Sequence, residues 1–311
     1  MSWLASLKQN LADWAAMSDA NNTASMNKRL SDYFDPSEVM CDGTFEDLGH
    51  ADSVVAGTLV YCDTVHYLQV ASANPHVSCI LTTLDLAAQA PSGKGLAVSS
   101  NPRNAFYRLH EGLDPYSLQG ETIIHPSAIV SSRARIGRGV VIAERVVIMD
   151  DVVVGDHSFI DAGAILGAEG LLYIREGGNN RRIRHRGAVF IGNHVTVLAS
   201  AVIARGIHPG QPTHIDDYSI VGIATSIGHE ARVGRNCVIS ANCVIARRAC
   251  IGDRAWVGAS AMVREYVQVG AGASVKAGSV VVEDVPEGAE VSGNFAVSHT
   301  RRMMQYLKEK K

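Results

Sequence analysis

Aromatic side chains are scarce in this sequence and make up 6% of its 311 residues. A core with so few large rings has to be filled by aliphatic and small side chains, which favours thin packed layers. No stretch of 18 apolar residues occurs, so we expect no transmembrane helix. The N-terminus lacks a basic region followed by an apolar one, so we expect no secretory signal peptide.

Cysteine is also sparse, with six residues and no C-x-x-C pair. Zinc sites usually show such pairs, so we expect no metal site, and we expect the chain in the reducing cytoplasm. The formal net charge of −3 gives no general case for nucleic-acid binding. No G-x-G-x-x-G motif follows the first expected strand, which argues against a Gly-rich nucleotide fold.

What the sequence does contain is an aliphatic residue at every sixth position over much of its length. The series runs over 130–166, resumes over 191–203 and continues over 215–281. Small residues often follow four positions later, as Ala255 follows Ile251. A period of six fits neither an α-helix nor an alternating strand, but it is typical of a parallel β-helix, in which three short strands make one coil. We therefore predict a mainly β protein built on a parallel β-helix.

The rest of the chain divides around this repeat. Apolar residues at helical spacing predict an N-terminal helix at 2–17, and strand-like runs alternating with helical ones predict a small α/β domain after it. The predicted order is residues 1–24, the helix and its connector; 25–120, the small α/β domain; 121–290, the β-helix with a loop at 167–190; and 291–311, a basic C-terminal helix.

The loop at 167–190 contains the most basic stretch of the chain. Loops carry function more often than regular coils do. Two interpretations stay open: a solvated arm, or an arm in which Arg182, Arg184 and His185 bind an anionic substrate or a cofactor phosphate. The basic C-terminal helix likewise fits a solvated helix end or a contact with an acidic carrier protein.

His229 is the candidate catalytic residue. It lies two positions after the inward-pointing Ile227, so its side chain is predicted to point out of the coil and to be exposed. A histidine can act as a general base near neutral pH. From position alone, a surface histidine without a role fits as well.

The segment TSIGHEARVG, which contains His229, resembles the histidine motif of acyltransferases that act on UDP-sugars in lipid A synthesis. The segments GTLVYCDTVHYL and NPRNAFYRL resemble the uridine-binding domain of the same enzymes. Over roughly residues 30–311 the chain is similar to the UDP-3-O-acylglucosamine N-acyltransferase family of hexapeptide-repeat proteins. The resemblance implies that the β-helix is left-handed.

The resemblance also implies roles for particular residues. His229 matches the catalytic base, and Arg247, one coil further on, stands where the family has a glycine whose backbone N–H serves the oxyanion. Tyr266 stands where the family has a second histidine. The uridine-pocket positions are matched by Tyr61, Thr64 and Tyr67, with Thr64 in place of an asparagine. These departures favour a different nucleotide-linked sugar as the substrate.

The implied reaction moves an acyl group from a phosphopantetheine thioester, on acyl carrier protein or coenzyme A, directly to the amine of a nucleotide-linked amino sugar. It implies a homotrimer with sites between subunits, in lipid A or surface polysaccharide synthesis, with no permanently bound cofactor. An acetyl-CoA-dependent sugar N- or O-acetyltransferase and a non-catalytic β-helix scaffold stay open as alternatives. A zinc site of His208, His214 and His229 is disfavoured because their spacing does not stack them on successive coils.

Overall fold

The computed structural model of the chain describes residues 27–113, 120–293, 298 and 308. The chain divides into two compact units, Met1–Ser117 and Leu118–Lys311. The helix predicted at 2–17 lies outside the described residues, as does the basic C-terminal helix apart from residues 291–293, 298 and 308. Within the described ranges, no helix has the length and apolar character needed to cross a membrane.

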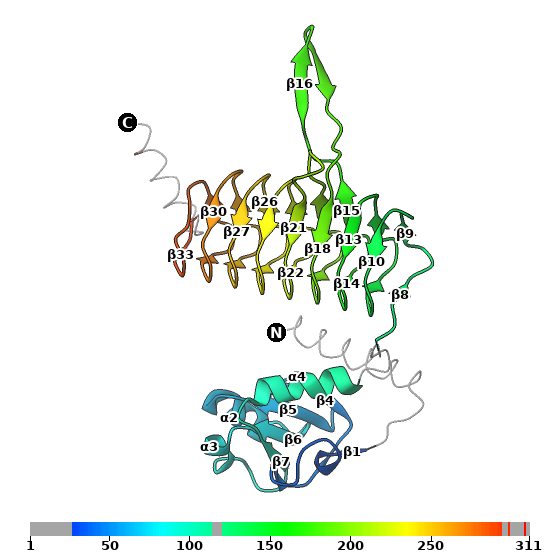
Figure 1. The fold of residues 1–311 in the computed structure, drawn as a ribbon. Helices are drawn as coiled ribbons and strands as arrows, with labels where there is room; N and C mark the ends of the chain where they lie inside the picture. The colour runs from blue at the N-terminus through cyan, green and yellow to red at the C-terminus, as the bar shows by residue number, and fades with distance from the viewer. Residues whose placement is uncertain (1–26, 114–119, 294–297, 299–307, 309–311) are drawn as a thin grey trace. The chain divides into compact units, whose positions relative to one another are not determined.

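The N-terminal unit is built around a five-stranded sheet (Figure 1). The strand order is β2-β7-β6-β5-β4, in which β4 to β7 run parallel and β2 is antiparallel to β7. The elements in chain order are β1 (Lys28–Arg29), η1 (Leu30–Asp32), β2 (Val39–Cys41), β3 (Thr44–Phe45), β4 (Asp47–Gly49), β5 (Thr58–Cys62), α2 (Val65–Ala73), β6 (Val77–Thr82), α3 (Leu84–Ala87), β7 (Gly95–Val98) and α4 (Pro102–Leu113).

Helices α2 and α4 pack into different apolar clusters of this sheet. Phe106 of α4 packs with Leu59 in one cluster, and Leu68 of α2 packs with Val60 and Ile80 in the other. Leu59 and Val60 are neighbours on β5, and successive side chains of a strand point to opposite faces. Buried β5 therefore supplies both layers of the core.

Residues Ile123 to Val291 form a left-handed parallel β-helix with three faces, each a parallel sheet (Figure 1). The first face contains β10 (Arg135–Ile136), β13 (Val152–Val154), β18 (Val189–Ile191), β21 (Thr213–Ile215), β24 (Arg232–Val233), β27 (Cys250–Ile251) and β30 (Gln268–Val269). The second contains β8 (Ile123–Ile124), β11 (Val141–Ile142), β14 (Phe159–Ile160), β19 (Thr196–Val197), β22 (Ile220–Val221), β25 (Val238–Ile239), β28 (Trp256–Val257), β31 (Ser274–Val275) and β33 (Glu290–Val291). The third contains β9 (Ile129–Val130), β12 (Val147–Ile148), β15 (Ile165–Ala168), β20 (Val202–Ala204), β23 (Ser226–Ile227), β26 (Val244–Ile245), β29 (Met262–Val263) and β32 (Val280–Val281).

The aliphatic residues of the six-residue repeat point inward and form one continuous core, as predicted. All of them are buried except Val130 and Ile136, which are half-buried and pack against the same core. Cys237 and Cys243 occupy small-residue positions and are 0% and 1% exposed. Burial raises the pKa of both thiols, so they are packing residues rather than nucleophiles.

Two insertions replace turns at one corner of the β-helix, between its third and first faces. The arm, residues 169–188, leaves after β15, forms the hairpin β16 (Tyr173–Glu176) and β17 (Asn179–Arg182), and returns at β18; it projects from the stack of coils (Figure 1). The loop at 205–212 joins β20 to β21. Backbone bonds tie the two insertions together, since Gly187 N–H donates to Gly206 O at 2.8 Å.

Candidate active site

His229 lies at the corner that carries both insertions, in the turn between β23 and β24. The prediction that it is exposed is wrong, because the residue is only 4% exposed. The base of the arm covers it. A Cβ atom on Gly170 would come within 2.9 Å of His229 Cδ2, and the His185 ring lies with its centroid 5.1 Å from that of His229, the planes 83° apart.

The two buried imidazoles have unused hydrogen-bonding capacity. Neither ring nitrogen of His229, nor Nε2 of His185, has a hydrogen-bond partner among the described residues. A buried nitrogen without a partner costs free energy, which is accepted mainly where a ligand or reaction uses it. Burial lowers the pKa of His229 below the ordinary 6.5, and His185 lowers it further. His229 is therefore neutral at pH 7 and able to accept a proton.

Glu230, the next residue of the turn, connects His229 to its surroundings. Its Oε2 lies 3.9 Å from His229 Nδ1, its carboxylate pairs with Arg248, and its Oε1 accepts the Ile207 N–H at 3.2 Å. Burial alone would raise the pKa of Glu230, but the hydrogen bonds from Arg248 and Ile207 outweigh it and the pKa lies below 4.5. An ionised Glu230 thus ties the loop at 205–212 to the turn of His229.

Glu230 and Arg248 were not singled out from the sequence. The signal for both was present, because the two residues are 18 positions apart. That is the spacing which places Arg247 one coil beyond His229 and which brings Arg248 beside Glu230.

The backbone of Arg247 passes close to the turn of His229. A Cβ atom on Gly228 would come within 2.5 Å of Arg247 N, so position 228 needs glycine, and Arg248 N–H donates to His229 O at 3.1 Å. The N–H of Arg247 itself has no acceptor in the part of the chain that the structure describes. This corner therefore holds a free backbone donor one coil away from a neutral imidazole.

Tyr266 lies on the far side of the same two arginines. The guanidinium carbon of Arg247 is 5.5 Å from the centre of the Tyr266 ring, and that of Arg248 is 5.8 Å from it. Such cation–π contacts orient a guanidinium without neutralising it. Tyr266 is 54% exposed and so forms the outer rim of this corner.

Of the predicted arm residues, only His185 is brought to His229. Arg182 and Arg184 have side chains that are 65% and 82% exposed, and they pair with Glu169 at 2.8 and 3.4 Å. Glu169 directly precedes Gly170, so these ion pairs join the two sides of the arm's base. His185 is 3% exposed.

Two of the three predicted nucleotide-binding residues meet in a cavity of about 670 Å³ in the N-terminal unit. Tyr61 and Tyr67 line it together with His66 and Arg103, beyond the carboxyl end of β5. Ligands of open α/β sheets bind at such strand ends. Thr64 is not among the lining residues, and its hydroxyl accepts the Tyr67 N–H at 3.4 Å, which caps α2.

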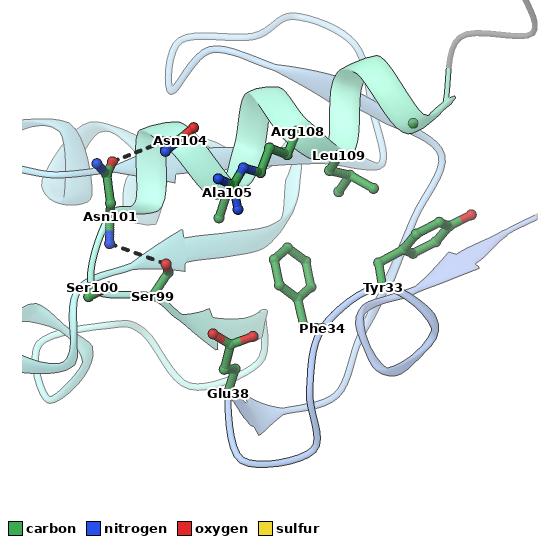
Figure 2. Close-up of a pocket in the computed structure, with 11 residues that line it drawn as sticks. Tyr33, Phe34, Glu38, Ser99, Ser100, Asn101, Asn104, Ala105, Arg108 and Leu109 are labelled. Carbon is green, nitrogen blue, oxygen red and sulfur yellow. Dashed lines mark hydrogen bonds between the residues drawn. The ribbon is translucent and has the colours of Figure 1, made fainter. Parts of the chain in front are cut away.

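A second hollow of about 600 Å³ lies along α4 (Figure 2). Its lining includes Tyr33, Phe34 and Arg108, none of which was singled out from the sequence. Asn101 is engaged locally, since its Oδ1 accepts the Asn104 N–H at 3.0 Å at the start of the helix. Among the described residues of the whole chain, no group of three or more His, Cys, Asp or Glu side chains is arranged to hold a metal ion.

Comparison with known proteins agrees with this architecture. Residues 133–168 match the family model described as bacterial transferase hexapeptide (six repeats). The UDP-3-O-acylglucosamine N-acyltransferase of Paracidovorax citrulli is 26% identical over 176 residues, covering 50% of this chain and 52% of that protein. The UDP-3-O-acylglucosamine N-acyltransferase of Coxiella burnetii is 30% identical over 192 residues, covering 49% of this chain and 55% of that protein.

The chain resembles the UDP-3-O-acylglucosamine N-acyltransferases. It spans about half the length of the curated relatives it matches. Among solved structures, a UDP-N-acetylglucosamine acyltransferase from Campylobacter jejuni aligns with a TM-score of 0.48 and 24% identity, covering 60% of this chain and 82% of that one.

Proposed function

We propose that this chain transfers an acyl group from a phosphopantetheine thioester to the amine of a nucleotide-linked amino sugar. The observation that carries the proposal is the corner around His229, where a buried, neutral imidazole with two free nitrogens lies one coil from the free N–H of Arg247. A general base and an oxyanion donor are the two parts that acyl transfer needs. The similarity to UDP-3-O-acylglucosamine N-acyltransferases supports the choice of a sugar amine as acceptor.

The reaction is a direct transfer. The amine nitrogen attacks the thioester carbonyl carbon, the new C–N bond forms, and His229 takes a proton from that nitrogen. The N–H of Arg247 stabilises the negative oxygen of the tetrahedral intermediate. The intermediate collapses, the C–S bond breaks, and the imidazolium gives its proton to the departing thiolate. The products are an amide and a free thiol.

The N-terminal cavity holds the nucleotide in this proposal. Tyr61 and Tyr67 offer aromatic surface for the base, and Arg103 offers a guanidinium for a phosphate. Acyl carrier protein or coenzyme A supplies the acyl group as a co-substrate, and no resident cofactor takes part.

The function is tested by measuring thiol release from acyl-CoA and acyl-carrier-protein donors with a panel of UDP- and dTDP-sugars. Each amino sugar is paired with the sugar that carries a hydroxyl at the same carbon. We expect release that depends on the amine and yields one amide per thiol. Release at the same rate with the hydroxyl partner, or without any sugar, would contradict the proposal.

A further inference from the structure

His185 differs from every other member of the basic run in the arm. It is 3% exposed, whereas Arg181, Arg182, Arg184 and Arg186 are exposed. Burying a polar ring costs free energy because the ring loses its hydration, so its contacts in the folded protein have to offset that cost. What lies against it is His229, at 5.1 Å between ring centroids.

The attachment of His185 leaves one edge of its ring free. Nδ1 lies 3.3 Å from the Gly170 N–H and 3.2 Å from Arg205 O, so it bonds to one or the other depending on the tautomer. Nε2 is buried and has no hydrogen-bond partner in the described chain. Nδ1 therefore ties the ring either to Gly170 of the arm or to Arg205 of the loop at 205–212, while the rest of the ring faces the site.

The surroundings of His229 come from three segments. Its own turn supplies Glu230, the next coil supplies Arg247 and Arg248, and the arm supplies Gly170 and His185. The arm lies directly against the ring, since a Cβ atom on Gly170 would come within 2.9 Å of His229 Cδ2 and the His185 ring is 5.1 Å away. A side chain that packs against a functional histidine also helps to fix the orientation of its ring, as His185 does for His229.

We propose that His185 is a positioning residue for the acyl-transfer reaction: carried on the arm, it packs against His229, excludes water from it and keeps it in the neutral form. This role rests on the proposed function of His229 and goes beyond phosphate binding by the arm. Two cationic imidazoles in contact would repel each other, so the pair favours a neutral His229. The direction of the His229 pKa agrees, since both burial and His185 lower it.

The test compares three variants of the full-length protein. His185→Phe keeps a ring against His229 but removes both nitrogens and any charge. His185→Asn keeps an oxygen that can accept the Gly170 N–H but removes the ring. Arg175→Gln changes an exposed arginine on the hairpin of the same arm and is the control. The readouts are the acid limb of kcat/KM against pH and the titration of His229 followed by NMR on protein labelled at the histidine rings.

For both His185 variants we expect the His229 titration and the acid limb to move to higher pH. We also expect kcat at pH 7 to fall about 10- to 100-fold, as when a residue that orients a functional histidine is lost. Arg175→Gln should match the wild type. A residue that only stabilised the arm would lower the melting temperature without moving either titration.

An NMR titration of His229 that does not move in either His185 variant overturns the role proposed for His185. The titration needs no turnover, so the result is independent of the reaction assigned to the protein. An acyl-transfer rate unaffected by His229→Gln overturns the proposed function instead.

Discussion

A histidine that works as a base at neutral pH has to be neutral before the reaction. His229 meets this condition because the arm buries it and lowers its pKa. It is held in place by its turn, by Glu230 and by the His185 ring. The sequence placed this residue at an outward corner, but it could not show the cover, because an insertion far away along the chain folds back over the corner.

The depressed pKa of His229 predicts how stability changes with acidity. In the unfolded chain the histidine binds a proton near pH 6.5, whereas in the folded chain it does so only at lower pH. The free energy of unfolding should therefore decrease as the pH falls below about 6.5. Melting curves at a series of pH values should show a steeper loss for the wild type than for His229→Gln. Parallel curves would argue against a buried neutral His229.

The backbone at position 247 can be tested separately from its side chain. Arg247→Gly keeps the N–H and should leave kcat within roughly tenfold of the wild type. Gly228→Ala places a methyl group 2.5 Å from Arg247 N and pushes that N–H away. Losing one oxyanion donor typically lowers kcat by about 10²- to 10³-fold. Steady-state kinetics of both variants, with melting temperatures as a check on folding, measure the difference. A larger loss for Arg247→Gly would assign the role to the guanidinium.

At the level of elements, most of the β-helix could be predicted from the sequence because its order is one-dimensional. Each strand is two to four residues long, and the inward side chain of each repeats every sixth position. In the N-terminal unit, β5, α2, β6, β7 and α4 could also be predicted, because their local sequence patterns agree with the elements they form. What could not be predicted depends on contacts between side chains: the packing of His185, at the base of the arm, against His229, and the pairing of Arg182 with Glu169. The capping role of Thr64 in α2 is a local contact that was also missed.

The inward assignment has a matched test on β30. Val269 is 2% exposed in the core, while its neighbour Gln268 points outward and is exposed. Val269→Glu buries an unpaired carboxylate and should cost about 3 kcal/mol or more of unfolding free energy. Gln268→Glu has nearly the same shape as the wild type and should change stability by less than about 0.5 kcal/mol. Denaturant unfolding of both variants measures this, and equal losses would contradict the assignment.

At the level of the whole molecule, the second and third faces of the β-helix carry exposed apolar side chains. Ile220 and Trp256 on the second face are 38% and 39% exposed, and Val244 and Val280 on the third are 44% and 55% exposed. Monomers seldom leave contiguous apolar surface in water. Such faces fit the homotrimer that the resemblance implies, in which the thin phosphopantetheine chain would lie between neighbouring subunits.

The trimer predicts a solution mass of three times the 33.2 kDa chain mass. Light scattering coupled to size-exclusion chromatography measures that mass directly. Val244→Lys places a charge on an outward face without touching the core, so it should yield monomers that are still folded. A wild-type protein that is monomeric at micromolar concentration would contradict a site between subunits.

The general-base role of His229 is tested most directly by the single-turnover rate of amide formation by the wild type and by His229→Gln. The substrate is the nucleotide-linked amino sugar that gives the fastest thiol release, and the product is followed by mass spectrometry. The control is His157→Gln, an exposed histidine at another corner. We expect a loss of about 10²- to 10⁴-fold for His229→Gln, the range typical of a missing general base, and no loss for the control. A His229→Gln protein that retains more than about a tenth of the wild-type rate would contradict the general-base role.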